Sequence, residues 1–107
     1  MSKMKINQVE FEFDPTDYLK VKAVEEAQET MLLEVEEAQK VEYPAKWMEY
    51  KAYIDIIKGF FVHLTGADVI GDCSSYDKVL GFVAEFTETI VAARKETIAK
   101  YSVKRVR

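Results

Sequence analysis

Three long segments repeat apolar residues every three or four positions, and only two short breaks separate them. This spacing is typical of one buried face of an α-helix. Tyr43-Pro44 makes the first break, because proline is tolerated in the first turn of a new helix but not inside an old one. The second break holds Gly66 and Gly71. The predicted helices span residues 18–41, 45–64 and 75–101.

Capping residues stand at the expected ends of these helices. Thr16 or Asp17 can accept hydrogen bonds from the free amides of the first helix, directly after Pro15. Gly66 suits the left-handed conformation that ends many helices. Ser74 can cap the third helix, with the Asp77 carboxylate near its amide end.

A strand-like segment precedes the helices. In residues 9–13 three apolar side chains alternate with two glutamates, which is the period of a half-buried strand. Residues 3–6 can pair back on this segment through a two-residue turn at Asn7-Gln8. A lone hairpin is marginally stable in water, so we expect the hairpin over residues 3–13 to lie on the helices.

Length and composition fit one small domain. A chain of 107 residues with 49% hydrophobic residues builds one modest core, and 4 Gly and 2 Pro argue against a many-turned all-β fold. The predicted class is α+β, mainly α: an N-terminal β-hairpin packed on about three helices. Residues 1–101 form the domain and residues 102–107 a basic tail. With no apolar run near the roughly 18–20 residues that span a bilayer, and no visible signal peptide, we expect a soluble, cytosolic protein.

Charge divides the chain into two unequal parts. Residues 1–93 hold 9 Lys/Arg and 18 Asp/Glu, a net charge of −9, whereas residues 94–107 hold six Lys/Arg against Glu96, a net charge of +5. An acidic body argues against nucleic acid as a partner. The basic end can instead meet an acidic protein surface.

The first helix carries this acidity on one face. Leu32 is expected to widen the opposite, apolar stripe. At ~1.5 Å per residue the helix would be about 36 Å long, so it is either broken or projects toward a partner. The acidic face is either solvated or meets a basic partner. The stripe is Val21, Val24, Ala27, Met31, Val35, Ala38 and Val41, and the acidic face is Glu25, Glu26, Glu29, Glu34, Glu36 and Glu37.

The second helix has more aromatic residues than one buried face requires. The surplus predicts either a fully buried central helix or an interface. The candidate partner-binding residues are Trp47, Tyr50, Tyr53 and Phe60 on this helix, with Lys100, Lys104, Arg105 and Arg107 at the basic end.

No pattern of catalytic or metal-binding residues stands out. His63 lacks a motif that would position a partner for acid–base chemistry, and Asp72 beside Cys73 disfavours a thiolate. Asp68, Asp72 and Asp77 lack the spacing of a calcium loop, so we expect them to form turns and caps. The chain is therefore expected to be no enzyme and to hold no cofactor.

Three segments together resemble a family of small phage and prophage proteins of Gram-positive bacteria, the tail-assembly chaperones encoded near the tail tube and tape-measure proteins. They are MKINQVEFEFD (residues 4–14), GDCSSY (71–76) leading into VLGF (79–82), and YSVKRVR (101–107). The resemblance implies binding without catalysis: keeping a helical tape-measure protein from aggregating while tube subunits assemble.

Two other classes compete with this one. An oligomeric structural component of the virion would use the same apolar face to join copies of the chain. A small acidic regulator of a host protein would use the first helix as a nucleic-acid mimic. The mass of the isolated protein and its competition with DNA distinguish these classes.

Overall fold

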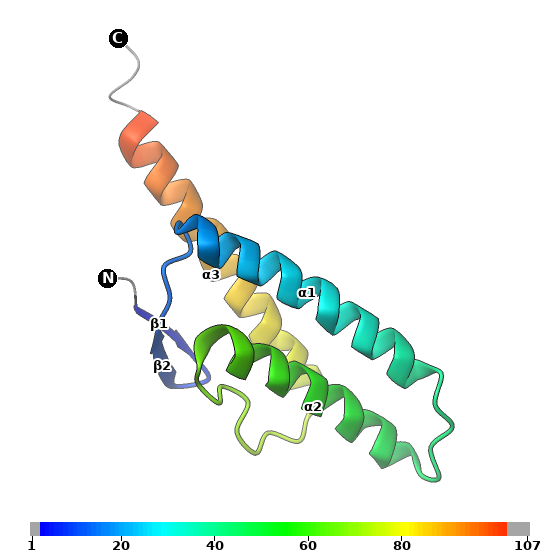
Figure 1. Cartoon of the computed structure of the whole chain (residues 1–107). Coiled ribbons are helices and arrows are strands. Elements are labelled where there is room, and N and C mark those ends of the chain that lie inside the picture. Colours follow the sequence, from blue (N-terminus) through cyan, green and yellow to red (C-terminus); the bar gives the residue numbers. More distant parts are fainter. Residues whose placement is uncertain (1–2, 103–107) are drawn as a thin grey trace.

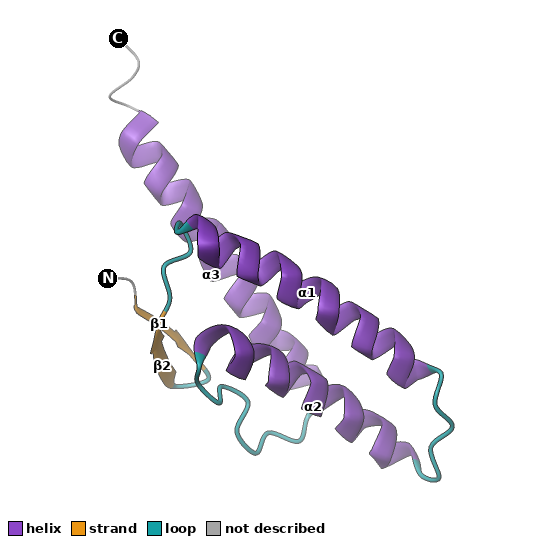
Figure 2. Cartoon of the chain, in the orientation of Figure 1, coloured by secondary structure: helices purple, strands orange, loops and turns teal. Residues whose placement is uncertain are grey.

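A two-stranded antiparallel hairpin followed by three helices makes up the fold, in a computed structural model that describes residues 3–102 (Figures 1 and 2). The predicted class, α+β and mainly α with an N-terminal hairpin, is confirmed. The elements are β1 (Lys3–Ile6), β2 (Val9–Glu12), α1 (Tyr18–Gln39), α2 (Lys46–Thr65) and α3 (Tyr76–Ser102).

The hairpin turn is the one that the sequence predicted. Asn7 and Gln8 have φ angles of 52° and 64°, so both central residues are left-handed, as a type I′ turn requires. Ile6 pairs with Val9 across the turn. The Asn7 side-chain amide donates a 2.8 Å hydrogen bond to the Val69 carbonyl, which fastens the turn to the segment between α2 and α3.

Phe86 of α3 lies at the centre of the core. Its ring centroid is 5.4 Å from that of Phe13 and 5.4 Å from that of Phe61, and 6.3 Å from those of Phe11 and Phe60. Three of these four contacts are edge-to-face, a favourable geometry for aromatic rings. One side chain therefore joins the hairpin, α2 and α3.

Helix α1 packs along α2, and α3 crosses behind both in the view of Figure 1. The predicted stripe of α1 is confirmed from Val21 to Ala38, where its residues are buried or half-buried. Leu32 does not widen the stripe, contrary to expectation: it is exposed, because it lies about 100° around the helix from the half-buried Met31. Val41 is also exposed, since α1 ends at Gln39.

The caps largely follow the sequence. The Asp17 carboxylate accepts a 2.9 Å bond from the Leu19 amide, and Gly66 ends α2 with a φ of 73°. The third cap differs from the expectation. Ser75, not Ser74, caps α3, because its Oγ accepts a 3.2 Å bond from the Lys78 amide.

The end of α3 projects beyond the rest of the fold. Figure 1 shows the last turns of α3 extending past the hairpin and the start of α1. Arg94 ties this half of α3 to the segment before α1, because its Nε donates a 2.9 Å bond to the Pro15 carbonyl. α1 is unbroken and lies against α2, so the expectation that the first helix is broken or projects is wrong, and the projecting element is α3.

Candidate protein-binding surface

The four aromatic candidates on α2 divide between surface and core. Trp47 is 64% exposed and Tyr50 48% exposed, as a binding surface requires. Tyr53 and Phe60 are only 6% and 5% exposed, so the expectation that they stand exposed beside Trp47 and Tyr50 is wrong. The reason is that Tyr53 packs against Tyr76 of α3, whereas Phe60 belongs to the phenylalanine core.

The buried Tyr53 packs against the half-exposed Tyr50. The ring centroids of Tyr50, Tyr53 and Tyr76 lie 5.3–6.3 Å apart and form a tyrosine cluster between α2 and the start of α3. The Tyr53 hydroxyl donates a 2.6 Å hydrogen bond to Glu49, whose other carboxylate oxygen lies 3.1 Å from the Lys46 ammonium. The cluster holds the half-exposed Tyr50 in place.

These contacts change two pKa values. The hydrogen bond to Glu49, helped by desolvation, raises the pKa of Tyr53 to about 12. The bonds from Tyr53 and then Lys46 lower the pKa of Glu49 below its ordinary value. Both shifts favour the state in which the protonated Tyr53 phenol donates a hydrogen bond to the ionised Glu49 carboxylate.

Trp47 and Tyr50 border a groove of about 540 Å³, which we call the aromatic groove. One wall is the first half of α2, including Ile54, and the other is the segment from Gly71 to Ser74. Paired charges stand at its rim: Lys51 lies 2.9 Å from Asp55, and Lys58 lies 3.5 Å from Asp68 and donates to the Gly71 carbonyl at 3.0 Å. An apolar wall with a polar rim is the usual anatomy of a protein interface.

The Gly71–Ser74 wall of this groove follows a turn at Asp68, one of the three aspartates for which the sequence predicted turns or caps. The Asp68 carboxylate accepts a 3.0 Å bond from the Gly71 amide, and Val69 and Ile70 between them are buried. Cys73 is half-buried, and its Sγ lies 3.9 Å from the Ser75 carbonyl. The groove is therefore anchored in the core on both sides.

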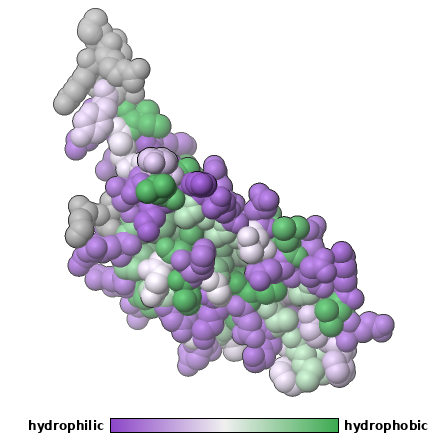
Figure 3. Space-filling view, in the orientation of Figure 1, coloured by the Kyte–Doolittle hydropathy of each residue, from purple (hydrophilic) through white to green (hydrophobic). Residues whose placement is uncertain are grey.

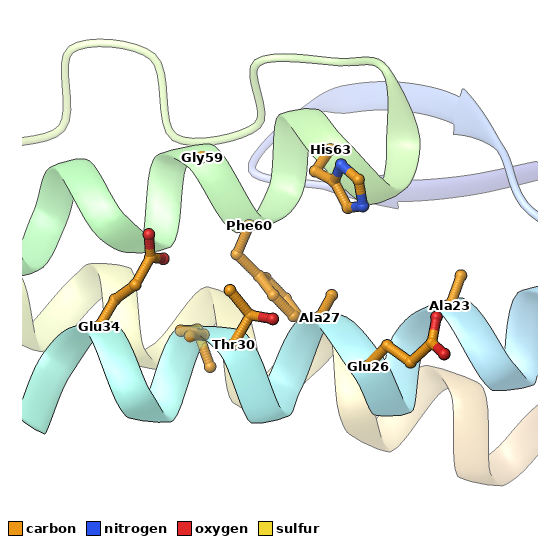
Figure 4. A pocket seen from close by; sticks show the side chains of 9 residues that line it. Ala23, Glu26, Ala27, Thr30, Glu34, Gly59, Phe60 and His63 are labelled. Carbon is orange, nitrogen blue, oxygen red and sulfur yellow. The ribbon is translucent and has the colours of Figure 1, made fainter.

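A second groove lies between α1 and α2, and we call it the α1–α2 groove (Figure 4). His63 lines it near the end of α2 and is exposed. Gly59 lines it as well, and sequence reasoning missed this residue. The signal that could have identified it is an isolated glycine inside a helical pattern. Over residues 3–102, no group of three or more His, Cys, Asp or Glu side chains is arranged to hold a metal ion.

The two halves of the predicted binding set are far apart. Lys100 is exposed on the last turn of α3, and Figure 1 shows this end of the molecule opposite the start of α2, where Trp47 stands. The other three basic candidates, Lys104, Arg105 and Arg107, lie outside the described residues. The aromatic groove and the basic end are thus separate surfaces.

The face shown in Figure 3 is mostly hydrophilic, with apolar residues gathered in islands along it. None of the helices described between residues 3 and 102 has the long apolar stretch that crossing a bilayer requires. Comparison with family models, with curated proteins and with solved structures gave no match to this chain.

Proposed function

We propose that this chain is a non-enzymatic protein-binding chaperone of phage or prophage tail assembly, which holds an apolar segment of a tape-measure or tail-tube protein in the bacterial cytoplasm. The observation that carries the binding role is the aromatic groove, with the exposed Trp47 and half-exposed Tyr50 at its border. The assignment to tail assembly is supported by the three sequence segments that resemble the chaperone family.

The groove has the properties that strong protein contacts require. Trp and Tyr are enriched among the residues that dominate binding energy, and such residues act best when their neighbours hold them in one position. Tyr50 meets this condition because Tyr53 and Tyr76 pack against it. The charged side chains at the rim pair with one another, so the wall of the groove is available to apolar side chains of a partner.

The test is co-expression with each tail protein encoded beside the chain, followed by purification and measurement of Kd. Replacing Trp47→Ala together with Tyr50→Ala should weaken binding by about tenfold or more, as truncation of dominant interface residues does. Tyr18→Ala with Leu19→Ala is the matched control, since these two residues are also exposed and apolar but lie at the start of α1.

A chain that ends at residue 99 tests the basic end in the same assay. Loss of co-purification assigns Lys100 and the residues after it to the tail partner. Equal binding by the Trp47→Ala, Tyr50→Ala variant and the parent chain would refute the aromatic groove as the contact. Competition with DNA for a host protein, without affinity for tail proteins, would favour the acidic regulator instead.

A further inference from the structure

The α1–α2 groove is an open apolar depression of about 510 Å³. Its floor contains Ala27 and Met31 from α1 and Phe60 from α2, and Figure 4 shows the Phe60 ring directed toward α1. Gly59 deepens it: a Cβ added at this position would meet no atom within 4 Å. The missing side chain leaves room between the helices for a side chain from elsewhere.

The edge of this groove is acidic. Glu26 and Glu34 line it, and Figure 4 shows the Glu34 carboxylate reaching across toward α2. The whole of α1 carries six glutamates against two lysines. An occupant with an apolar side chain flanked by positive charge would therefore complement the groove.

The chain itself contains such a segment. Residues 95–107 hold five Lys/Arg against Glu96. Ile98 is 64% exposed on the projecting end of α3, and Lys95 lies one turn before it on the same face. This end points away from the α1–α2 groove of its own molecule (Figure 1), so the groove that it can enter belongs to another copy.

We infer that residues 95–107 of one copy dock in the α1–α2 groove of a second copy, with Ile98 on the apolar floor and the basic residues against Glu26 and Glu34. Because the two contacting surfaces differ, the contact either closes reciprocally in a dimer or continues from copy to copy. It does not use the aromatic groove, so the binding role proposed for that groove does not depend on it.

The first test fills the groove without changing its charge. Gly59→Leu places a side chain in the open space, and Gly81→Leu is the matched control, since Gly81 is also an exposed helical glycine with no atom within 4 Å of an added Cβ but lies on α3. Sedimentation equilibrium of the parent chain and of the control should give at least twice the 12.3 kDa of one chain. The Gly59→Leu variant should stay at the mass of one chain.

The second test exchanges charges. Glu26→Lys with Glu34→Lys should abolish self-association, whereas Glu25→Lys with Glu36→Lys, outside the groove lining, should leave it at or near the parent's level. Lys95→Glu with Lys104→Glu should abolish it too. A chain with both the groove and the tail reversals should associate again, and rising ionic strength should weaken association of the parent.

Circular dichroism of each variant confirms that the helices remain. A parent chain that stays monomeric at every concentration refutes the inference, even if the groove then binds a basic helix of another protein. So does an oligomer whose mass is unaffected by both Gly59→Leu and the groove charge reversal. Binding to tail proteins is measured separately, so failure of self-docking leaves the aromatic groove untouched.

Discussion

Phe86 shows how much of this small core depends on a single side chain. It is fully buried and its ring contacts four phenylalanines from two other parts of the chain, the hairpin segment and α2. Phe86→Ala should lower the free energy of unfolding by about 3–5 kcal/mol, because truncation leaves a cavity among rings that cannot collapse onto it. Urea titration measures the change. Phe82→Ala, four residues earlier and only partly buried, should cost clearly less; equal losses would contradict the central position of Phe86.

Tyr53 makes a pH prediction. Its hydrogen bond to Glu49 raises its pKa to about 12 from an ordinary value of 10.0. The resulting stability is fully present below about pH 10 and is lost as the pH rises through 12. Thermal unfolding across this range should show that alkaline loss, and Tyr53→Phe should reduce it.

Tyr50→Phe is the control for this pH dependence, because it removes a hydroxyl from the same cluster and keeps the Tyr53–Glu49 bond. It should leave the alkaline loss in place. Tyrosinate absorbance gives a second measurement, in which the parent chain should contain one late-titrating tyrosine that the Tyr53→Phe variant lacks.

Residue-scale errors in the sequence prediction have one cause. α2 carries apolar residues around most of its circumference, so helical spacing identified the helix but not its buried side. Tyr53 and Phe60 turned out to contact Tyr76 and Phe86 of α3, which are remote from them in sequence. Trp47 and Tyr50 remain exposed because they lie at the start of α2, at the end of the fold away from the phenylalanine core.

At the scale of elements, the hairpin turn holds the clearest opportunity for stabilisation. Gln8 has a left-handed φ of 64°, which costs a residue with a Cβ roughly 1–2 kcal/mol. Gln8→Gly should therefore raise the free energy of unfolding by up to about 1 kcal/mol, after the entropy of glycine is counted. Gln8→Ala keeps the strain and should give no gain; an equal gain from alanine would rule out backbone conformation as the cause.

Most element boundaries were readable from the sequence because local chemistry determines them. Gly66 and Asp17 act as the caps that their residue types predicted. Local chemistry does not distinguish Ser74 from Ser75, since either hydroxyl suits a helix start. The path of the preceding segment decides which hydroxyl meets a free amide of α3, and here it is that of Ser75. The α1–α2 groove was equally invisible, because it depends on Gly59 facing α1.

At the scale of the whole molecule, α3 has two halves of different character. Its first half carries the buried residues Val79, Phe86 and Ile90, whereas residues 98–101 are all exposed. Local stability follows buried contacts, so amide hydrogens over residues 95–101 should exchange about tenfold or more faster than those over 79–90. Hydrogen exchange monitored at low protein concentration tests this. Uniform protection along α3 would contradict the prediction.

Selection for stability and selection for assembly should favour different residues at position 59. Glycine inside a helix costs roughly 0.5–1 kcal/mol relative to alanine, and no neighbouring atom here requires so small a residue. A library of variants sorted by cellular abundance should therefore enrich larger residues at this position. The same library sorted by assembly of the protein should deplete the larger residues. The difference between the two rankings would measure how much assembly depends on the open space at Gly59.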